Sequence, residues 1–431
     1  MKRYEYPRLD EVLCRERLEN GLTVAVLPRK GFSKRLAYLV TGFGSLHTDF
    51  RLGGKEYHVP AGVAHYLEHK LFDMPDGTSA DARFAQLGAM TNAFTSYDMT
   101  AYYFSCTENF DECLELLLKF VCTPWFTGES VEKERGIIDQ EIGMYADSPD
   151  GQVFENLTRT LYHAHPIRVP ILGTGETIRA ITPETLYTCH RAFYTPENML
   201  LCVIGDVDAE EVAAIARRTL PPQPQGVGEK LPFPEEPMTG GGTVECPMEV
   251  AMPMFNLGFK CEPIDRGEDA ARLEMVADLA AEALFGESSG LYLRLYEAGL
   301  IDSSFGGGFE AVEGCAMLLC SGDSDDPAAV KAAILEEAQR LAREGVPEET
   351  FQRLRRSALG RRIRALDSFD STCFRLCASH FADFDYFRFP ALYETIRPED
   401  LRNFLAQTVT ENRSALSILT PLQGEDDKGE I

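Results

Sequence analysis

A break near the middle of the chain limits the possible folds more than any other feature of the sequence. Residues 221–242 (PPQPQGVGEKLPFPEEPMTGGG) are dense in proline and glycine and carry no apolar period. Such composition is typical of a linker between domains. We therefore expect a first domain over residues 1–220 and a second over 243–422. Residues 423–431 (QGEDDKGEI) are expected to form a disordered acidic tail.

The two halves repeat one order of elements. The first half begins with apolar strand-like runs, continues with amphipathic helices and closes with the run NMLLCVIG. A strand–helix–helix–strand order found in the first half appears again, more faintly, in the second, where two further helices follow it. This order predicts a duplicated α+β unit. The expected fold class is α+β, with two similar α/β-sandwich domains in which helices pack on one face of a mixed sheet. The helices expected in the first half cover residues 62–72, 79–87, 108–121 (with Thr107 as N-cap) and 129–146.

The net charge and the cysteine content limit the classes of partner and the cellular location that we expect for this chain. The chain has 42 Lys and Arg against 68 Asp and Glu, a formal net charge of −26. Phosphate backbones would repel such a chain, so we expect no nucleic-acid partner. No apolar run reaches the roughly 18 residues that span a bilayer, and we expect no membrane association. The twelve cysteines include no C-x-x-C pair, which favours buried reduced thiols and a cytoplasmic location.

The segment His65-Tyr66-Leu67-Glu68-His69 carries the clearest chemistry. On a helix the two histidines, four residues apart, project from one face and can converge on one ion. Zinc accepts imidazole nitrogens and keeps a position for water when it has three protein ligands. Glu68, three residues after His65, is placed to act as general base in the inverted zincin motif H-x-x-E-H. The alternative interpretation is an exposed helix on which these residues are merely polar.

A third ligand is needed, and a later helix offers two candidates. In ESVEKERGIIDQEIGMY, Glu134 and Glu141 lie on one face two turns apart. One can ligate zinc while the other orients a ligand histidine. The spacing does not choose between them, and both could equally be solvated surface charges.

HYLEH followed by ERGIIDQE resembles the insulinase/pitrilysin family of zinc metallopeptidases, which includes the mitochondrial processing peptidases. The resemblance implies zinc bound by His65, His69 and Glu141, with Glu134 as the family's upstream acid behind a ligand. The stretch LGAMTNAFTSYDMTAYYF resembles the family's substrate-binding edge strand. By that resemblance Asn92 and Ala93 bind the substrate backbone, as in β-strand addition. Asn92 could instead simply close a strand.

One part of the family pattern is missing. Active members carry an Arg and a Tyr, seven residues apart, that bind substrate carbonyls and the oxyanion. Here the matching positions hold Leu295 and Asp302, and Arg294 is one residue out of register. The resemblance thus implies half of a clamshell, the zinc subunit of a dimer whose homologous partner supplies the Arg and Tyr, or else a homodimer. The expected activity is a zinc-dependent endopeptidase acting on peptides or unfolded segments. The alternative is a non-catalytic assembly subunit of the same family.

Overall fold

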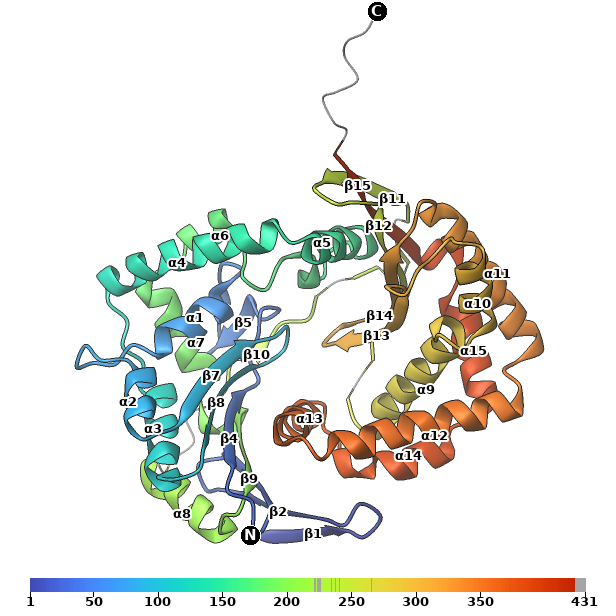
Figure 1. Ribbon diagram of the computed structural model, residues 1–431. Helices are drawn as coiled ribbons and strands as arrows, with labels where there is room; N and C mark the ends of the chain where they lie inside the picture. The colour runs from blue at the N-terminus through green and yellow to red at the C-terminus, as the bar shows by residue number, and fades with distance from the viewer. Residues whose placement is uncertain are drawn as a thin grey trace, which may run out of the picture. The chain divides into compact units, whose positions relative to one another are not determined.

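The computed structural model describes residues 1–220, 222, 226–233, 235–236, 238–239, 241–264 and 266–422 (Figure 1). The predicted linker 221–242 lies partly outside these residues, and the predicted tail 423–431 lies wholly outside them. Contacts divide the chain into two compact units. Unit 1 comprises Met1–Ile142, Val169–Pro232 and Arg361–Pro390, and unit 2 comprises Gly143–Arg168, Phe233–Gly360 and Ala391–Ile431. Each half of the sequence therefore gives one segment to the unit built mainly by the other half.

Unit 1 is built on a seven-stranded sheet of order β1-β2-β3-β9-β4-β8-β7. Only β3 and β9 run parallel, and the other neighbours are antiparallel. Every residue of β9 (MLLCVIG) is buried, because helices cover both faces at the sheet centre. The strands are β1 Lys2–Tyr6, β2 Glu11–Arg17, β3 Thr23–Pro28, β4 Arg35–Thr41, β7 Met90–Thr95, β8 Thr100–Cys106 and β9 Met199–Gly205. A separate sheet of order β10-β5-β6 joins β5 Asp49–Leu52, β6 Lys55–His58 and β10 Glu229–Lys230.

Most helices of unit 1 lie on one face of this sheet. Side chains of β3, β4 and β9 pack there in one core with residues of α1, α3 and α8. Each fully buried leucine of this core contributes about 1.5–3 kcal/mol of transfer free energy. The helices are α1 Val63–Leu71, α2 Ala80–Gln86, α3 Phe110–Cys122, α4 Gly128–Ala146, whose last residues belong to unit 2, α6 Gly175–Arg179, α7 Pro183–Phe193 and α8 Ala209–Thr219.

One helix covers the opposite face. Leu201 and Val203 point into the core shared with α1 and α3, so Cys202 between them points away from it. There the Sγ of Cys202 lies 3.6 Å from the Sγ of Cys373 on α13 Phe369–Phe381. Figure 1 shows α13 on the other side of β4 from α3. The predicted mixed sheet with helices is confirmed, and α13 adds a second helical layer that comes from the far end of the sequence.

Unit 2 holds a five-stranded sheet of order β11-β15-β12-β14-β13. Helices α9 and α15 contact one face, and α5 Pro149–Leu161 contacts β11, β12 and β15. Gly258 of β12 allows this approach, since a Cβ there would lie 3.0 Å from Leu157 of α5. The strands are β11 Thr243–Met248, β12 Met254–Cys261, β13 Gly306–Val312, β14 Cys315–Asp323 and β15 Ser414–Pro421. The remaining helices are α9 Glu268–Phe285, α10 Gly290–Glu297, α11 Pro327–Glu344, α15 Pro398–Thr408 and two that extend into unit 1, α12 Glu348–Ala365 and α14 Phe389–Thr395. Single 3₁₀ turns lie at Pro166–Arg168 and Glu411–Arg413 in unit 2 and at Pro196–Asn198 and Tyr386–Arg388 in unit 1.

The two sheets share one topology. Strands β3, β4, β7, β8 and β9 occupy the order 3-9-4-8-7, and β11 to β15 occupy the corresponding order 11-15-12-14-13. Within these two orders the first pairs, β3-β9 and β11-β15, are parallel, and the other pairs are antiparallel. This agreement supports the predicted duplication. The boundaries 1–220 and 243–422 stay a prediction, since the contact units exchange α5 and α13 between the two halves of the sequence.

One predicted helix start is wrong. The third helix begins at Phe110, and Asn109, not Thr107, occupies the N-cap with a φ of 54°. Asparagine tolerates this left-handed conformation better than other residues with a Cβ.

Candidate active site

Helix α1 carries the three residues of the H-x-x-E-H motif, and the two residues between His65 and Glu68 anchor the helix. Tyr66 and Leu67 are fully buried, and they fix the rotation of the helix. The Tyr66 hydroxyl also donates to the carbonyl oxygen of Val131 on α4. That bond joins the two helices, and the histidines of the motif face the stretch of α4 that carries Glu134 and Glu141.

The structure brings together three of the predicted residues, His65, His69 and Glu141. The Oε2 of Glu141 lies 3.7 Å from Nε2 of His65 and 3.6 Å from Nε2 of His69. One ligand atom from each residue lies within 4.8 Å of the others, and this is the group of that kind found in the described part of the chain. Two imidazoles and one carboxylate are the donor set of many catalytic zinc sites.

Glu134 occupies a different position from Glu141. Its Oε1 accepts a hydrogen bond of 2.9 Å from Nδ1 of His69. With the proton held on Nδ1, the Nε2 lone pair of His69 is left to face Glu141. Burial opposes ionisation of Glu134, but the hydrogen bond and charge of His69 outweigh it and lower the pKa of that carboxyl.

The two histidines differ in their surroundings. Burial lowers the pKa of His65 to about 3, so its imidazole is neutral, as metal ligation requires. Its Nδ1 is buried and has no hydrogen-bond partner among the described residues. Burial also disfavours charge on His69, yet the hydrogen bond to Glu134 and three nearby carboxylates raise its pKa overall. A neutral imidazole beside one polarised by a carboxylate fits a divalent zinc ion.

Glu68 stands beside this group and is not part of it. Its side chain is buried, and burial raises its pKa, partly opposed by a hydrogen bond from Thr95. The Thr95 Oγ1 donates to Oε2 of Glu68 over 2.6 Å. A carboxylate with a raised pKa is suited to accept a proton and give it back near neutral pH. Thr95 ends β7, so the strand expected to bind substrate also holds the candidate base.

Asn92 and Ala93 lie in the middle of β7. This strand has one neighbour, β8, in the sheet formed by the described residues, and therefore presents an open edge. The side chain of Asn92 is exposed, and its Oδ1 accepts a hydrogen bond of 2.8 Å from the amide of Ala93. The geometry allows an extended peptide to add along this edge.

The positions that would hold the family's Arg and Tyr offer no free donor in unit 2. Leu295 is buried in α10, and Asp302 accepts a hydrogen bond of 2.7 Å from the amide of Ser304. Arg294 donates to Oε2 of Glu337, a buried carboxylate on α11, over 2.9 Å. Unit 1 therefore holds a group of side chains suited to bind a metal ion, whereas positions 295 and 302 of unit 2 hold no arginine and tyrosine that could donate to a substrate.

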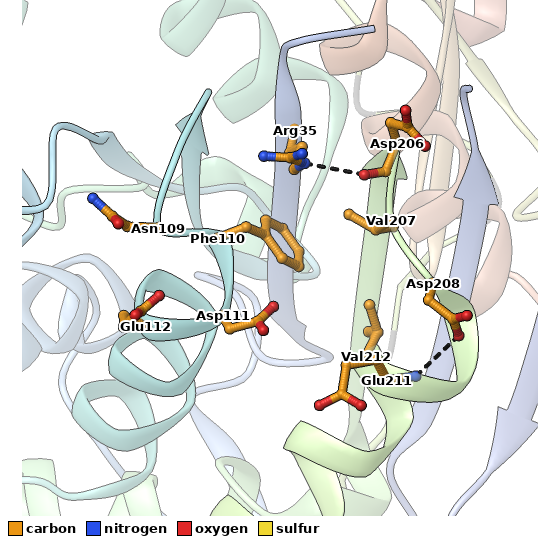
Figure 2. Close-up of a pocket in the computed structure, with 10 residues that line it drawn as sticks. All are labelled: Arg35, Asn109, Phe110, Asp111, Glu112, Asp206, Val207, Asp208, Glu211 and Val212. Carbon is orange, nitrogen blue, oxygen red and sulfur yellow. Dashed lines mark hydrogen bonds between the residues drawn. The ribbon is translucent and has the colours of Figure 1, made fainter. Parts of the chain in front are cut away.

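A separate cavity of about 410 Å³ lies in unit 1 between the N-terminal ends of α3 and α8 (Figure 2). Arg35 lines it and donates through Nε to the carbonyl of Asp206 over 3.0 Å. Most of the polar lining is carboxylate, including Asp111, Asp208 and Glu211. None of the predicted site residues lines this cavity.

Within the described residues, no helix combines the length and apolar character needed to cross a membrane.

Comparison with known proteins agrees with this geometry. Residues 55–175 match the family described as insulinase (peptidase family M16), and residues 180–358 match the peptidase M16 inactive domain. A Bacillus subtilis (strain 168) relative named uncharacterized zinc protease YmfH is 37% identical over 435 residues, which cover 98% of this chain and 99% of the relative.

Solved structures agree as well. An M16-like peptidase from Alicyclobacillus acidocaldarius is 32% identical with a TM-score of 0.90, over 95% of this chain and 98% of the other. A protease from Helicobacter pylori, 20% identical over 95% of this chain and 99% of the other, shares the fold with a TM-score of 0.81. The 37% identity to YmfH over nearly the full length of both chains, together with the family match over the H-x-x-E-H helix, places this chain in the insulinase family of peptidases, family M16.

Proposed function

We propose that the chain is a zinc-dependent endopeptidase that hydrolyses peptides or unfolded segments. The observation that carries the proposal is the convergence of His65, His69 and Glu141 beside the buried carboxylate of Glu68. The name zinc protease carried by its relatives supports the same class of reaction. In this proposal the three converging residues hold Zn²⁺, with Glu134 fixing the ring of His69.

The residues of the chain divide the work of peptide hydrolysis among them. When bound, zinc acts as a Lewis acid and lowers the pKa of water. Glu68 removes a proton from the attacking water and returns it to the leaving amine, and Thr95 holds Glu68 in place for both transfers. The open edge of β7 at Asn92 and Ala93 aligns an extended substrate. Main-chain hydrogen bonding of this kind suits unfolded segments better than folded proteins.

The proposal extends to a second subunit. Leu295 cannot donate a hydrogen bond, and ionised Asp302 is an acceptor only. We therefore propose a homologous partner that supplies the Arg and Tyr and closes a chamber around the substrate, as in processing peptidases. A homodimer is the alternative arrangement. A cytoplasmic location belongs to the same proposal, and the twelve cysteines, all unpaired, support it.

A second candidate function is a non-catalytic assembly subunit. The match of residues 180–358 to a domain described as inactive is the observation that favours it. The two candidates separate in one assay, because an assembly subunit needs neither zinc nor Glu68.

Zinc content and turnover test the proposal directly. The purified chain is expected to bind one Zn²⁺, and His65→Ala or Glu141→Ala should abolish binding. Glu68→Gln should keep zinc and lose peptide turnover, whereas His58→Ala, at an exposed histidine, should change neither. Full zinc content in Glu141→Ala would refute the ligand assignment. Turnover that survives Glu68→Gln would refute the catalytic role.

The partner is tested by mixing. The chain alone should bind zinc and cleave a quenched fluorescent peptide slowly, because losing one oxyanion donor typically lowers the rate by about 10²–10³. Adding a homologous chain that carries the Arg and Tyr but lacks H-x-x-E-H should raise turnover. The same partner with its Tyr changed to Phe is the matched control and should remove most of the gain. Rapid cleavage by the chain alone, unchanged by the partner, would contradict the division of labour.

A further inference from the structure

A lysine ammonium lies buried next to the candidate zinc group. Lys70 directly follows His69 in α1 and is only 1% exposed, which is rare for lysine. Burying an ammonium costs free energy unless opposite charges compensate it. The Nζ of Lys70 has two such partners, Oδ2 of Asp73 and, at 4.0 Å, Oε2 of Glu134.

The two partners lie in different surroundings. The side chain of Asp73 is 45% exposed and lies just after the end of α1. The side chain of Glu134 is 14% exposed and belongs to α4, the helix that also carries Glu141. Lys70 therefore links the helix of the two histidines to the helix of the two glutamates.

Glu134 uses its two oxygens for two different neighbours. Oε1 accepts the hydrogen bond from Nδ1 of His69, and Oε2 faces Lys70. A single hydrogen bond leaves a long side chain free to turn about its own rotatable bonds, whereas a second partner on the other oxygen fixes the carboxylate plane. Both oxygens are thus held behind His69, away from the Nε2 atoms that face Glu141.

We propose that Lys70 is a positioning residue that gives the two glutamates of α4 their separate roles. By holding Oε2, it keeps Glu134 on Nδ1 of His69, and Glu141 alone then stands with the two Nε2 atoms. Without the ammonium, the Glu134 carboxylate is free to turn, the ring of His69 is held less firmly, and Glu134 competes with Glu141 as a ligand. This inference rests on the proposed zinc site and concerns how that site selects its third ligand.

The test measures zinc affinity instead of activity alone. In Lys70→Met, the Kd for Zn²⁺, measured by competition with a chromophoric chelator, should rise about 10–100-fold, as for other residues that orient a metal-bound histidine. The visible absorption of the Co²⁺-substituted protein should change shape, because the ligand set is no longer unique. Lys70→Arg keeps the charge and should recover most of the affinity. Lys119→Met, at an exposed lysine paired with Glu115 on α3, is the matched control and should leave Kd and spectrum unchanged.

A double-mutant cycle separates positioning from general stability. If Lys70 acts through Glu134, adding Lys70→Met to Glu134→Gln should raise Kd little beyond the single Glu134→Gln variant. Asp73→Asn removes the other ion pair and should leave the zinc affinity at the wild-type value. The Arg and Asn variants keep the test decisive even where Lys70→Met does not fold.

Two results would overturn the proposal. One is folded Lys70→Met protein with wild-type Kd and wild-type Co²⁺ spectrum. The other is a loss in Asp73→Asn as large as that in Glu134→Gln, which would make the ion pairs a structural feature only. A wild-type chain that binds no zinc, or binds it equally after His65→Ala, would instead count against the proposed function.

Discussion

At the scale of single residues, Thr95 controls the candidate base. Thr95 is the last residue of β7, and its hydroxyl donates a hydrogen bond of 2.6 Å to Oε2 of Glu68. Thr95→Val keeps the shape of the side chain and removes the donor to a charged acceptor, a contribution of about 1.5–3 kcal/mol. We expect kcat/KM for peptide hydrolysis to fall about 10–100-fold while zinc content stays at one per chain.

Thr95→Ser is the control for this prediction, because it retains the hydroxyl and should keep most of the activity. Loss of zinc in Thr95→Val, or full activity in that variant, would show that Thr95 does not act through Glu68.

Glu235 makes a second residue-scale prediction, about pH and stability. Its carboxylate accepts hydrogen bonds from the amides of residues 163–165 and pairs with Lys260. Burial acts to raise the pKa, but the ion pair with Lys260 and the amides lower it to about 2 from the ordinary value of 4.5. Since the pKa is lower in the folded protein, this stabilisation is fully present above pH 4.5 and is lost as the pH falls toward 2. It amounts to about 3 kcal/mol.

The measurement compares thermal unfolding of Glu235→Gln and wild type at pH 7 and at pH 3. The difference in stability should be large at pH 7 and should shrink at pH 3. Glu236→Gln, at the exposed neighbouring residue, should show no such trend. An equal loss at both pH values would contradict the electrostatic origin.

Residues close in sequence were predictable here, and residues joined only by the fold were not. The i, i+4 spacing of His65 and His69 suffices to predict their convergence. The spacing of Glu134 and Glu141 left the choice of ligand open. Which of the two glutamates reaches the histidines depends on the position of α4 along the axis of α1, and the spacing does not contain that information. The parts played by Thr95 and Lys70 rest on partners 27 and 64 positions away, and no local pattern marks them.

At the scale of elements, the start of α1 depends on a close approach between two loops. Gly62 precedes the helix with a φ of +88°, and a Cβ there would lie 2.4 Å from the carbonyl oxygen of Leu172. Gly62→Ala should destabilise the protein by more than the roughly 1–2 kcal/mol of left-handed strain. It should also weaken zinc binding, because α1 must shift.

Gly77→Ala is the matched control, since Gly77 has a φ of +79° and open space around it. That variant carries the strain alone, so its unfolding temperature should fall less and its zinc affinity should not change. Equal effects of the two substitutions would show that the contact with Leu172 is unimportant.

Strongly patterned elements were predictable, and those decided by tertiary burial were not. The helices near residues 62–72 and 129–146 and the strand near 198–205 match α1, α4 and β9 to within about two residues. The hairpin of β1 and β2 was not expected, because its strands (KRYEY and EVLCRER) are mostly polar. Helix α5 was also missed, because its apolar face is buried by contacts with β12 and β15, which lie far away in the sequence.

At the scale of the whole molecule, the exchange of helices predicts that the halves do not fold alone. A fragment of residues 1–220 keeps the first sheet but lacks α13, which leaves Cys202 uncovered, and it keeps α5 without its sheet. We expect this fragment to aggregate or to bind a hydrophobic dye, without a cooperative thermal transition. Coexpression with residues 221–431 should give a soluble complex, because each fragment supplies the helix that the other lacks.

The full chain is the reference for both measurements, by size-exclusion chromatography and circular dichroism. A monomeric 1–220 fragment that unfolds cooperatively would contradict the interdependence of the halves.

The contact between Cys202 and Cys373 also has a consequence for the order of events during synthesis. The two thiols are 171 positions apart in the chain. A ribosome adds about 5–20 residues per second, so β9 emerges roughly 10–30 s before the helix that covers it. During that interval an apolar face of the first sheet stands in water on every nascent chain. We therefore expect translation speed and the supply of chaperones to influence the yield of this protein, separately from the stability of the complete fold.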